Sequence, residues 1–277
     1  MSDSPPDVEK ELVAKLEDGV LWLTINRADA GNAIPYYVRD RLIEHFVDAH
    51  ANLAVRCVVI TAAGERHFCT GADLRTRPPA PTKLEGQPDM VAGSAVHIMR
   101  TGFQRLMESI QDCQKPVICA LNGTAAGGGV MLALASDLVV AADTARIIHV
   151  FVRRGLIPDG GVAYLLPRLV GLHKAKELAF FGDDLNMEDA EKLGIVNKVV
   201  PPAELQATAL EWATRLAHGP TKAIGWTKQL LNETLDVDRR TLLVTEAMIV
   251  EMNAHTLDGK EGVASFMERR PPDFKGW

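Results

Sequence analysis

The sequence lacks the cysteine patterns that mark metal centres and redox sites. Its four cysteines, Cys57, Cys69, Cys113 and Cys119, include no C-x-x-C pair, and no histidine stands beside them at metal-ligand spacing. Three of them lie among apolar or small residues. We therefore expect reduced thiols in an intracellular, cytoplasmic protein, and no metal site.

Signals for secretion and membrane insertion are also missing. Residues 1–7 (MSDSPPD) are acidic and interrupted by prolines, unlike the charged and then apolar layout of a signal peptide. One apolar stretch, Pro116 to Ala142, carries only Asp137 as a charge, but Asn122 and several glycines interrupt it. A spanning helix needs about 20 consecutive apolar residues. We therefore expect no membrane partner.

The chain has no excess of positive charge and no standard phosphate-binding loop. Its net charge of -6 gives no general affinity for nucleic acid. Gly123 and Gly128 have the spacing of a P-loop, but Gly129 and Val130 stand where that motif requires Lys and Ser or Thr. No G-x-G-x-x-G with an acidic partner stands out either. We expect no nucleic-acid partner and no nucleotide site of these two classes.

What is present is an alternation of strand and helix patterns. Strands are expected at residues 12–17 and 20–25, joined by an Asp18-Gly19 turn, and at 56–61, 117–121, 137–141 and 145–150. A helix is expected at 35–51, with Leu42, Ile43, Phe46 and Val47 on one face. After Pro158 the pattern is mostly helical. The sequence therefore predicts an α/β core over residues 1–200 and a helical region over 201–277.

A loop and one long helix are expected between the third and fourth strands. Residues 75–94 are rich in proline, glycine and charge, which is typical of a loop. Residues 95–113 have the period of a helix with one buried stripe. The stripe consists of Val96, Met99, Phe103, Leu106 and Ile110.

Two glycine-containing turns each follow an expected strand. The first is Phe68-Cys69-Thr70-Gly71-Ala72-Asp73-Leu74, and the second runs from Asn122 to Gly129 and opens a helix. Glycine lets backbone N–H groups approach a ligand closely, and a helix N-terminus favours developing negative charge. Two N–H groups that converge on one oxygen form an oxyanion hole. The alternative is that the glycines only allow tight packing of strand on helix.

The two turns and their surroundings resemble the crotonase superfamily, the enoyl-CoA hydratase/isomerase group. The resemblance covers nearly the whole chain, through residues 23–27 with 32–33, 68–74, 116–137, 155–161, 166–171, 190–200 and 261–274. It implies an α/β fold, a spiral of ββα units followed by a helical C-terminal trimerisation region. It also implies an acyl-CoA thioester substrate, no metal or redox cofactor, and a homotrimer or a dimer of trimers.

The resemblance assigns roles to individual residues. The backbone N–H groups of Ala72 and Gly128 would form the oxyanion hole. Thr70, Gly71, Asp73 and Leu74, beside the first donor, would contact the acyl-CoA, and Asp73 is expected to orient this turn.

The resemblance also places two further residues, Met131 and Phe151, in the acyl-CoA pocket. Family hydratases carry glutamates at these two positions, and neither Met nor Phe can move a proton. The chain therefore departs from the hydratase pattern at both catalytic positions.

One carboxylate remains near the expected pocket, Asp159 in the segment Pro158-Asp159-Gly160-Gly161. Some isomerases of the family carry an acidic residue here, and a double-bond shift needs a single base. An apolar pocket would raise the pKa of this carboxylate and favour proton transfer. The hypothesis is therefore an enoyl-CoA isomerase with Asp159 as the acid/base. The alternatives are a helix N-cap role for Asp159, a hydratase with a reduced acid/base set, and a non-catalytic acyl-CoA-binding protein.

Other polar residues receive structural interpretations. Asp137 lies in an apolar stretch and is expected to cap a helix or to pair within the core. His67, His97 and His149 lack the partner spacing of a metal site or a catalytic triad. We expect no catalytic role for these four residues.

Overall fold

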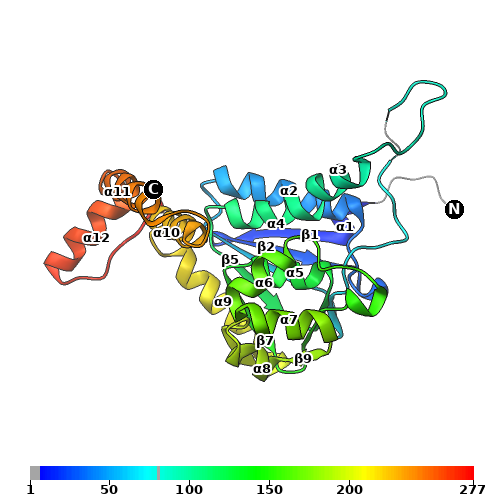
Figure 1. Cartoon of the computed structure of the whole chain (residues 1–277). Coiled ribbons are helices and arrows are strands. Elements are labelled where there is room, and N and C mark those ends of the chain that lie inside the picture. Colours follow the sequence, from blue (N-terminus) through cyan, green and yellow to red (C-terminus); the bar gives the residue numbers. More distant parts are fainter. Residues whose placement is uncertain (1–6, 80–81) are drawn as a thin grey trace.

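Two β-sheets form the centre of the computed structural model, which describes residues 7–79 and 82–277 (Figure 1). The six-stranded sheet has the order β1-β2-β3-β5-β7-β10, and the four-stranded sheet has the order β4-β6-β8-β9. The larger sheet consists of β1 (Leu12–Glu17), β2 (Val20–Ile25), β3 (Cys57–Ala62), β5 (Val117–Leu121), β7 (Leu138–Ala142) and β10 (Lys198–Val200). The smaller consists of β4 (His67–Cys69), β6 (Thr124–Ala126), β8 (Arg146–Ile148) and β9 (Asp184–Asn186). Residues 1–6 of the N-terminal segment and residues 80–81 of the expected loop over 75–94 lie outside the described residues.

The chain winds between the two sheets in a repeated order. β3 and β4, β5 and β6, and β7 and β8 each place one strand in the larger sheet and the next in the smaller. The pairings β2·β3, β3·β5, β5·β7 and β7·β10 are parallel, as are β4·β6 and β6·β8. β3 and β5 are almost fully buried, because helices or the second sheet cover both faces. The predicted α/β spiral of ββα units is confirmed.

Helices cover the sheets on the outside and connect the successive strands. In the core they are α1 (Val8–Glu11), α2 (Tyr36–Ala51), α3 (Ser94–Thr101), α4 (Phe103–Asp112), α5 (Gly128–Ala135), α6 (Val162–Val170), α7 (Leu172–Phe181), α8 (Met187–Lys192) and α9 (Pro202–Ala217). α9 packs on β3, β5 and β7. Its buried residues Leu205, Ala209 and Ala213 belong to the main hydrophobic core.

The expected single helix over residues 95–113 is wrong, because the chain breaks at Gly102 into α3 and α4. Gly102 has ψ -115°, which is far from the helical value. A Cβ atom at this residue would lie 2.6 Å from the Ile98 carbonyl oxygen and 2.7 Å from Arg39 Nη1. As a result only the second half of the expected stripe packs inward. Leu106 and Ile110 are buried, whereas Val96 is exposed.

Two further expectations need correction. The turn at residues 122–129 contains the short strand β6, which pairs with β4 and β8. Its three residues give no recognisable strand pattern of their own. On α2, Leu42 and Phe46 are buried as expected, but Val47 is exposed.

Three C-terminal helices follow the core, and the first of them packs against α4. They are α10 (Thr221–Glu233), α11 (Arg239–Ala254) and α12 (Leu257–Glu268), and α11 and α12 extend from one side of the molecule (left in Figure 1). α11 buries only Ile249 among its residues. Within the described residues, no helix is long and apolar enough to cross a membrane.

Candidate active site

Ala72 lies in a short parallel bridge that leaves its N–H group free. The bridge pairs it with Ile34. Ile34 N–H donates to the Gly71 carbonyl at 2.8 Å, and Asp73 N–H donates to the Ile34 carbonyl at 2.9 Å. Ile34 therefore bonds to the two neighbours of Ala72, and the N–H of Ala72 itself points away from Ile34. Among residues 7–79 and 82–277 this N–H donates to no protein acceptor.

Gly128 provides the second free donor, at the start of α5. The preceding residue, Gly127, has φ +53° and turns the chain from β6 into the helix. The N–H of Gly128 belongs to the first turn of α5, where intrahelical acceptors are lacking, and it also donates to no acceptor in the described part of the chain. The partial positive charge of the helix N-terminus adds to its affinity for an oxyanion.

The two turns are in direct contact. A Cβ atom at Gly71, which has φ +107°, would lie 3.3 Å from the Gly128 nitrogen. A Cβ atom at Gly129 would lie only 2.2 Å from the Cys69 carbonyl oxygen. Glycine at these two positions therefore brings the two backbones together. The turn that carries the Ala72 N–H and the helix start that carries the Gly128 N–H are therefore adjacent.

Phe103 connects this pair of donors to the segment that carries Asp159. A Cβ atom at Gly128 would lie 2.7 Å from Phe103 Cε1, and one at Gly160 would lie 3.4 Å from Phe103 Cβ. A Cβ atom at Gly160 would also lie 3.7 Å from Met131 Cγ. The backbone next to Asp159 and the second donor therefore contact the same aromatic side chain.

Asp159 does not cap the following helix. α6 begins at Val162, its N-cap residue is Gly161, and no side-chain hydrogen bond caps it. The N-cap interpretation of Asp159 is therefore wrong. The side chain is accessible to solvent, yet desolvation by the surrounding protein raises its pKa above the ordinary aspartate value.

Met131 and Phe151, the two positions where the hydratase pattern requires glutamate, are buried apolar side chains. Met131 lies on α5 one turn after Gly128. Phe151 directly precedes a 3₁₀ turn at Val152–Arg154, and its carbonyl accepts a hydrogen bond from Leu156 N–H at 2.9 Å. Neither side chain can transfer a proton.

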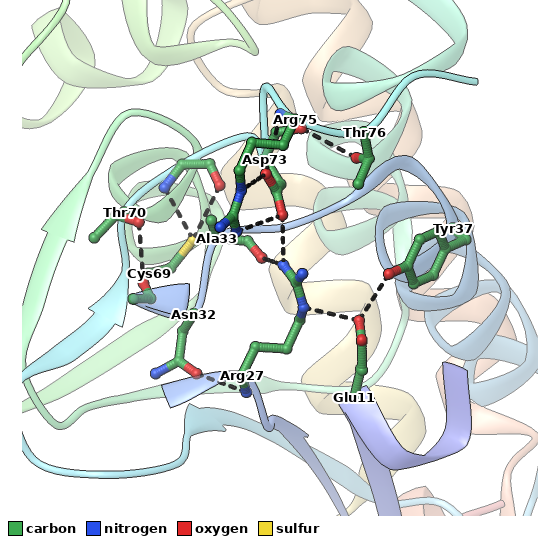
Figure 2. Close-up of polar contacts among 12 residues, drawn as sticks. Glu11, Arg27, Asn32, Ala33, Tyr37, Cys69, Thr70, Asp73, Arg75 and Thr76 are labelled. Atoms are coloured by element: carbon green, nitrogen blue, oxygen red, sulfur yellow. Dashed lines mark hydrogen bonds and ion pairs between the residues drawn. The ribbon is translucent and has the colours of Figure 1, made fainter. Parts of the chain in front are cut away.

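The carboxylate of Asp73 is engaged in ion pairs beside the first turn (Figure 2). It contacts Arg75 Nε at 2.8 Å and Arg27 Nη1 at 3.0 Å. These guanidinium groups, Arg75 more than Arg27, hold the pKa of Asp73 well below its usual range. Arg27 Nε also contacts Glu11 at 2.8 Å. This arrangement fits a role for Asp73 in orienting the turn.

The other predicted residues of the first turn have different surroundings. Thr70 Oγ1 donates to the Gly31 carbonyl at 3.0 Å, so its hydroxyl supports the turn. Leu74 is 86 % exposed and is free to meet a ligand. Sequence reasoning did not identify the roles of Phe103 and Arg27. Phe103 was interpreted as part of a core stripe rather than of an acyl pocket, and no short-range signal pairs Arg27 with Asp73.

Several polar or ionisable groups outside this site are buried or paired within the protein. Asp137 pairs with Lys228 Nζ at 2.8 Å, which confirms the expected pairing within the core. His149 is fully buried, and desolvation lowers its pKa to about 4. All four cysteines are free and buried. The described residues contain no group of three His, Cys, Asp or Glu side chains suited to a metal ion.

A cavity of about 610 Å³ lies between α4, α6 and α10. Met107 and Gly161 are part of its wall. A Cβ atom at Gly161 would lie 2.8 Å from Met107 Cε, so this wall is tightly packed two residues after Asp159.

Comparison with known proteins gives consistent matches along the chain. The family model for enoyl-CoA hydratase/isomerase matches residues 15–277. The 1,2-epoxyphenylacetyl-CoA isomerase of Escherichia coli strain K12 is 36 % identical over 96 % of this chain and 98 % of its own. The trans-2-decenoyl-[acyl-carrier-protein] isomerase of Streptococcus mutans is 29 % identical over 96 % and 98 %.

A solved structure extends this likeness to three dimensions. The enoyl-CoA hydratase from Bacillus anthracis matches with a TM-score of 0.86 and 31 % identity, over 96 % of this chain and all of its own. The relatives carry both isomerase and hydratase names, so they define the family and not the reaction. The chain is an enzyme of the enoyl-CoA hydratase/isomerase family, within the crotonase superfamily.

Proposed function

We propose that the protein isomerises enoyl-CoA thioesters with Asp159 as the only acid/base. The observation that carries this proposal is that Gly160, the residue after Asp159, lies against the same Phe103 side chain that contacts Gly128. A single carboxylate is sufficient for a double-bond shift, because the group that removes the proton can also return it.

The proposed reaction starts from a 3-enoyl-CoA. The Asp159 carboxylate removes a proton from C2, and the electron pair delocalises into the thioester to give a dienolate. The N–H groups of Ala72 and Gly128 hold the negative oxygen. The protonated Asp159 then delivers the proton to C4, which leaves a C2–C3 double bond. We propose that no metal or redox cofactor takes part, because the backbone donors provide the electrophile and no electrons leave the substrate.

A hydratase with Asp159 alone is the second candidate, and the hydratase name of the Bacillus anthracis protein favours it. Buried Met131 and Phe151 argue against it, because hydration needs groups that orient water and transfer its proton.

The two reactions are separated by assaying the purified enzyme on 3-enoyl-CoA and on crotonyl-CoA. We expect conjugation of the 3-enoyl substrate, seen as a gain of enone absorbance, to be much faster than loss of that absorbance from crotonyl-CoA. Faster hydration would favour the second candidate. Tight acyl-CoA binding without either reaction would contradict both, and would support a non-catalytic binding protein.

We also propose that the chain forms a homotrimer, or a dimer of trimers, through its C-terminal helices. α11 exposes Leu243, Val244, Met248 and Met252, which line one groove. Exposed apolar side chains gathered on one face of a helix are typical of an interface. The Met248→Lys variant is expected to dissociate the assembly. Light scattering should give three or six times the chain mass of 30.1 kDa for the wild type and a smaller value for the variant. A monomeric wild type would contradict the proposal.

A further inference from the structure

The direction of the Ala72 N–H group depends on the strand-like segment on its other side. The bridge from Ile34 fixes the Gly71 carbonyl and the Asp73 N–H, which lie on either side of Ala72. If the segment around Ile34 moved, both bonds would move with it and the Ala72 N–H would turn. The orientation of this donor is therefore decided by whatever holds residues 32–34 against residues 71–73.

Arg27 is the side chain that holds these two segments together (Figure 2). Its Nη1 atom donates to the Ala33 carbonyl on one side of the bridge. The same atom contacts Asp73 Oδ2 at 3.0 Å on the other side. The side chains of Arg27 and Asp73 are only 12 % and 3 % exposed, so solvent screens this ion pair weakly.

Two further contacts keep Arg27 in this position. Its Nε atom contacts Glu11 at 2.8 Å, and Glu11 also accepts a hydrogen bond from Tyr37 at 2.9 Å. Its backbone N–H donates to Asn32 Oδ1 at 2.9 Å. The Asn32 amide in turn donates to the carbonyls of Ala63 and His67. The guanidinium group is therefore fixed from the first helix, from its own backbone and from the turn.

We propose that Arg27 is a positioning residue for the oxyanion hole, which orients the Ala72 N–H group through Asp73 and Ala33. This inference depends on the proposed function, because it assumes that the Ala72 N–H binds the thioester oxygen. Arg75 also pairs with Asp73, but its side chain is 69 % exposed and does not reach the Ile34 side of the bridge in any described contact. Of the two arginines that pair with Asp73 in the described residues, Arg27 is the one that contacts both sides of the bridge.

The test compares Arg27→Met with Arg41→Met. Arg41 pairs with Glu9 and Glu44 on the surface and has no described contact with the turn, so it controls for the loss of an ion-paired arginine. Two ligands are titrated. Acetoacetyl-CoA forms an enolate that depends on the oxyanion hole and is read by its ultraviolet absorbance. An S-alkyl-CoA thioether lacks the thioester carbonyl oxygen and therefore reports on binding without the oxyanion hole.

We expect Arg27→Met to reduce both the enolate fraction of bound acetoacetyl-CoA and kcat, by up to about 10²-fold, as small displacements of catalytic groups do. Affinity for the thioether, and KM, should change by less than about threefold, because the CoA contacts are unchanged. Arg41→Met should match the wild type for both ligands. Equal losses for both ligands, or no loss of enolate, would contradict the positioning role.

Arg27→Lys decides the matter if Arg27→Met does not fold. Lysine keeps the charge but lacks the planar fork, so one ammonium group reproduces the contacts to Ala33, Asp73 and Glu11 only in part. An intermediate loss of enolate is expected, and wild-type enolate with Arg27→Lys would overturn the inference. If the wild type itself forms no enolate, the proposed oxyanion hole is wrong. If the wild type and the folded Arg27 variant form it equally, only the role of Arg27 is wrong.

Discussion

Replacing Asp159 by Asn is expected to reduce isomerisation of 3-enoyl-CoA by about 10²–10⁴-fold, the usual contribution of a general acid/base. Asparagine keeps the shape of the side chain but cannot accept the C2 proton. Because the carboxylate is accessible and caps no helix, the variant should fold normally. The measurement is steady-state turnover together with acyl-CoA affinity, and affinity should stay near that of the wild type.

Asp143→Asn is the matched control for this prediction. Asp143 is an exposed carboxylate that follows β7, and its backbone bonds to Val200 of β10. The control should keep full activity. Wild-type turnover in Asp159→Asn would remove the central support for the isomerase.

The pH dependence should identify the same residue. The base must be ionised, so activity is present above the pKa of Asp159 and is lost as the pH falls through it. Desolvation raises this pKa above 3.8, so the acidic limb of kcat/KM should lie higher than an ordinary aspartate would place it. The same desolvation penalises the ionised form in the folded protein above that pKa. Asp159→Asn should therefore melt at the same temperature as the wild type or slightly higher near neutral pH.

Replacing Lys228 by Met is expected to lower the free energy of unfolding by about 3–5 kcal/mol, as the loss of one partner of a buried ion pair does. Lys228 Nζ contacts Asp137 Oδ2 at 2.8 Å, and the two side chains are 6 % and 20 % exposed. Nζ also donates to the Ile110 carbonyl at the end of α4 at 2.8 Å. Without it, the Asp137 carboxylate keeps only the N–H of Val117 as a described donor.

Urea unfolding at several pH values would measure this loss. Desolvation already raises the pKa of Asp137, and the ammonium group opposes that effect. In Lys228→Met the buried carboxylate is penalised above its pKa, and protonation relieves the penalty as the pH falls through it. The deficit should therefore be larger at about pH 8 than at about pH 5.

Two comparison variants make this prediction specific. Adding Asp137→Asn to Lys228→Met should recover much of the stability, because the uncompensated charge is gone and the amide oxygen can still accept from Val117. Lys192→Met removes an exposed lysine that pairs with Glu188, and should cost less than about 1 kcal/mol. A loss in Lys228→Met no greater than in Lys192→Met would show that the buried pair contributes little.

The sequence predicted the α/β core and the two glycine-containing turns because both depend on local patterns. Apolar runs such as residues 57–62 and 117–121 indicate strands buried on both faces. The glycines at 71 and 127–129 mark turns whose backbone must approach another chain segment. These signals are contained within a few neighbouring residues.

The features that were missed depend on residues far apart in the chain. Arg27 and Asp73 are 46 residues apart in the sequence. They come into contact where the bridge between Ile34 and Ala72 pairs their two segments. At the break, the space beside Gly102 is filled by Arg39, which is distant in the sequence, and a helical period cannot show this. The capping alternative for Asp159 failed because α6 begins two residues later than a cap at Asp159 requires.

The two donors at Ala72 and Gly128 belong to the main chain, and this has an evolutionary consequence. No exchange of a side chain deletes an N–H group, except a change to proline. The reaction that we propose for this chain, by contrast, depends on the side chains at positions 131, 151 and 159. Mutation can therefore replace the proton-transfer groups of an ancestor one at a time while its descendants still stabilise an enolate. Such a lineage can acquire a new reaction while its backbone N–H groups continue to stabilise the enolate.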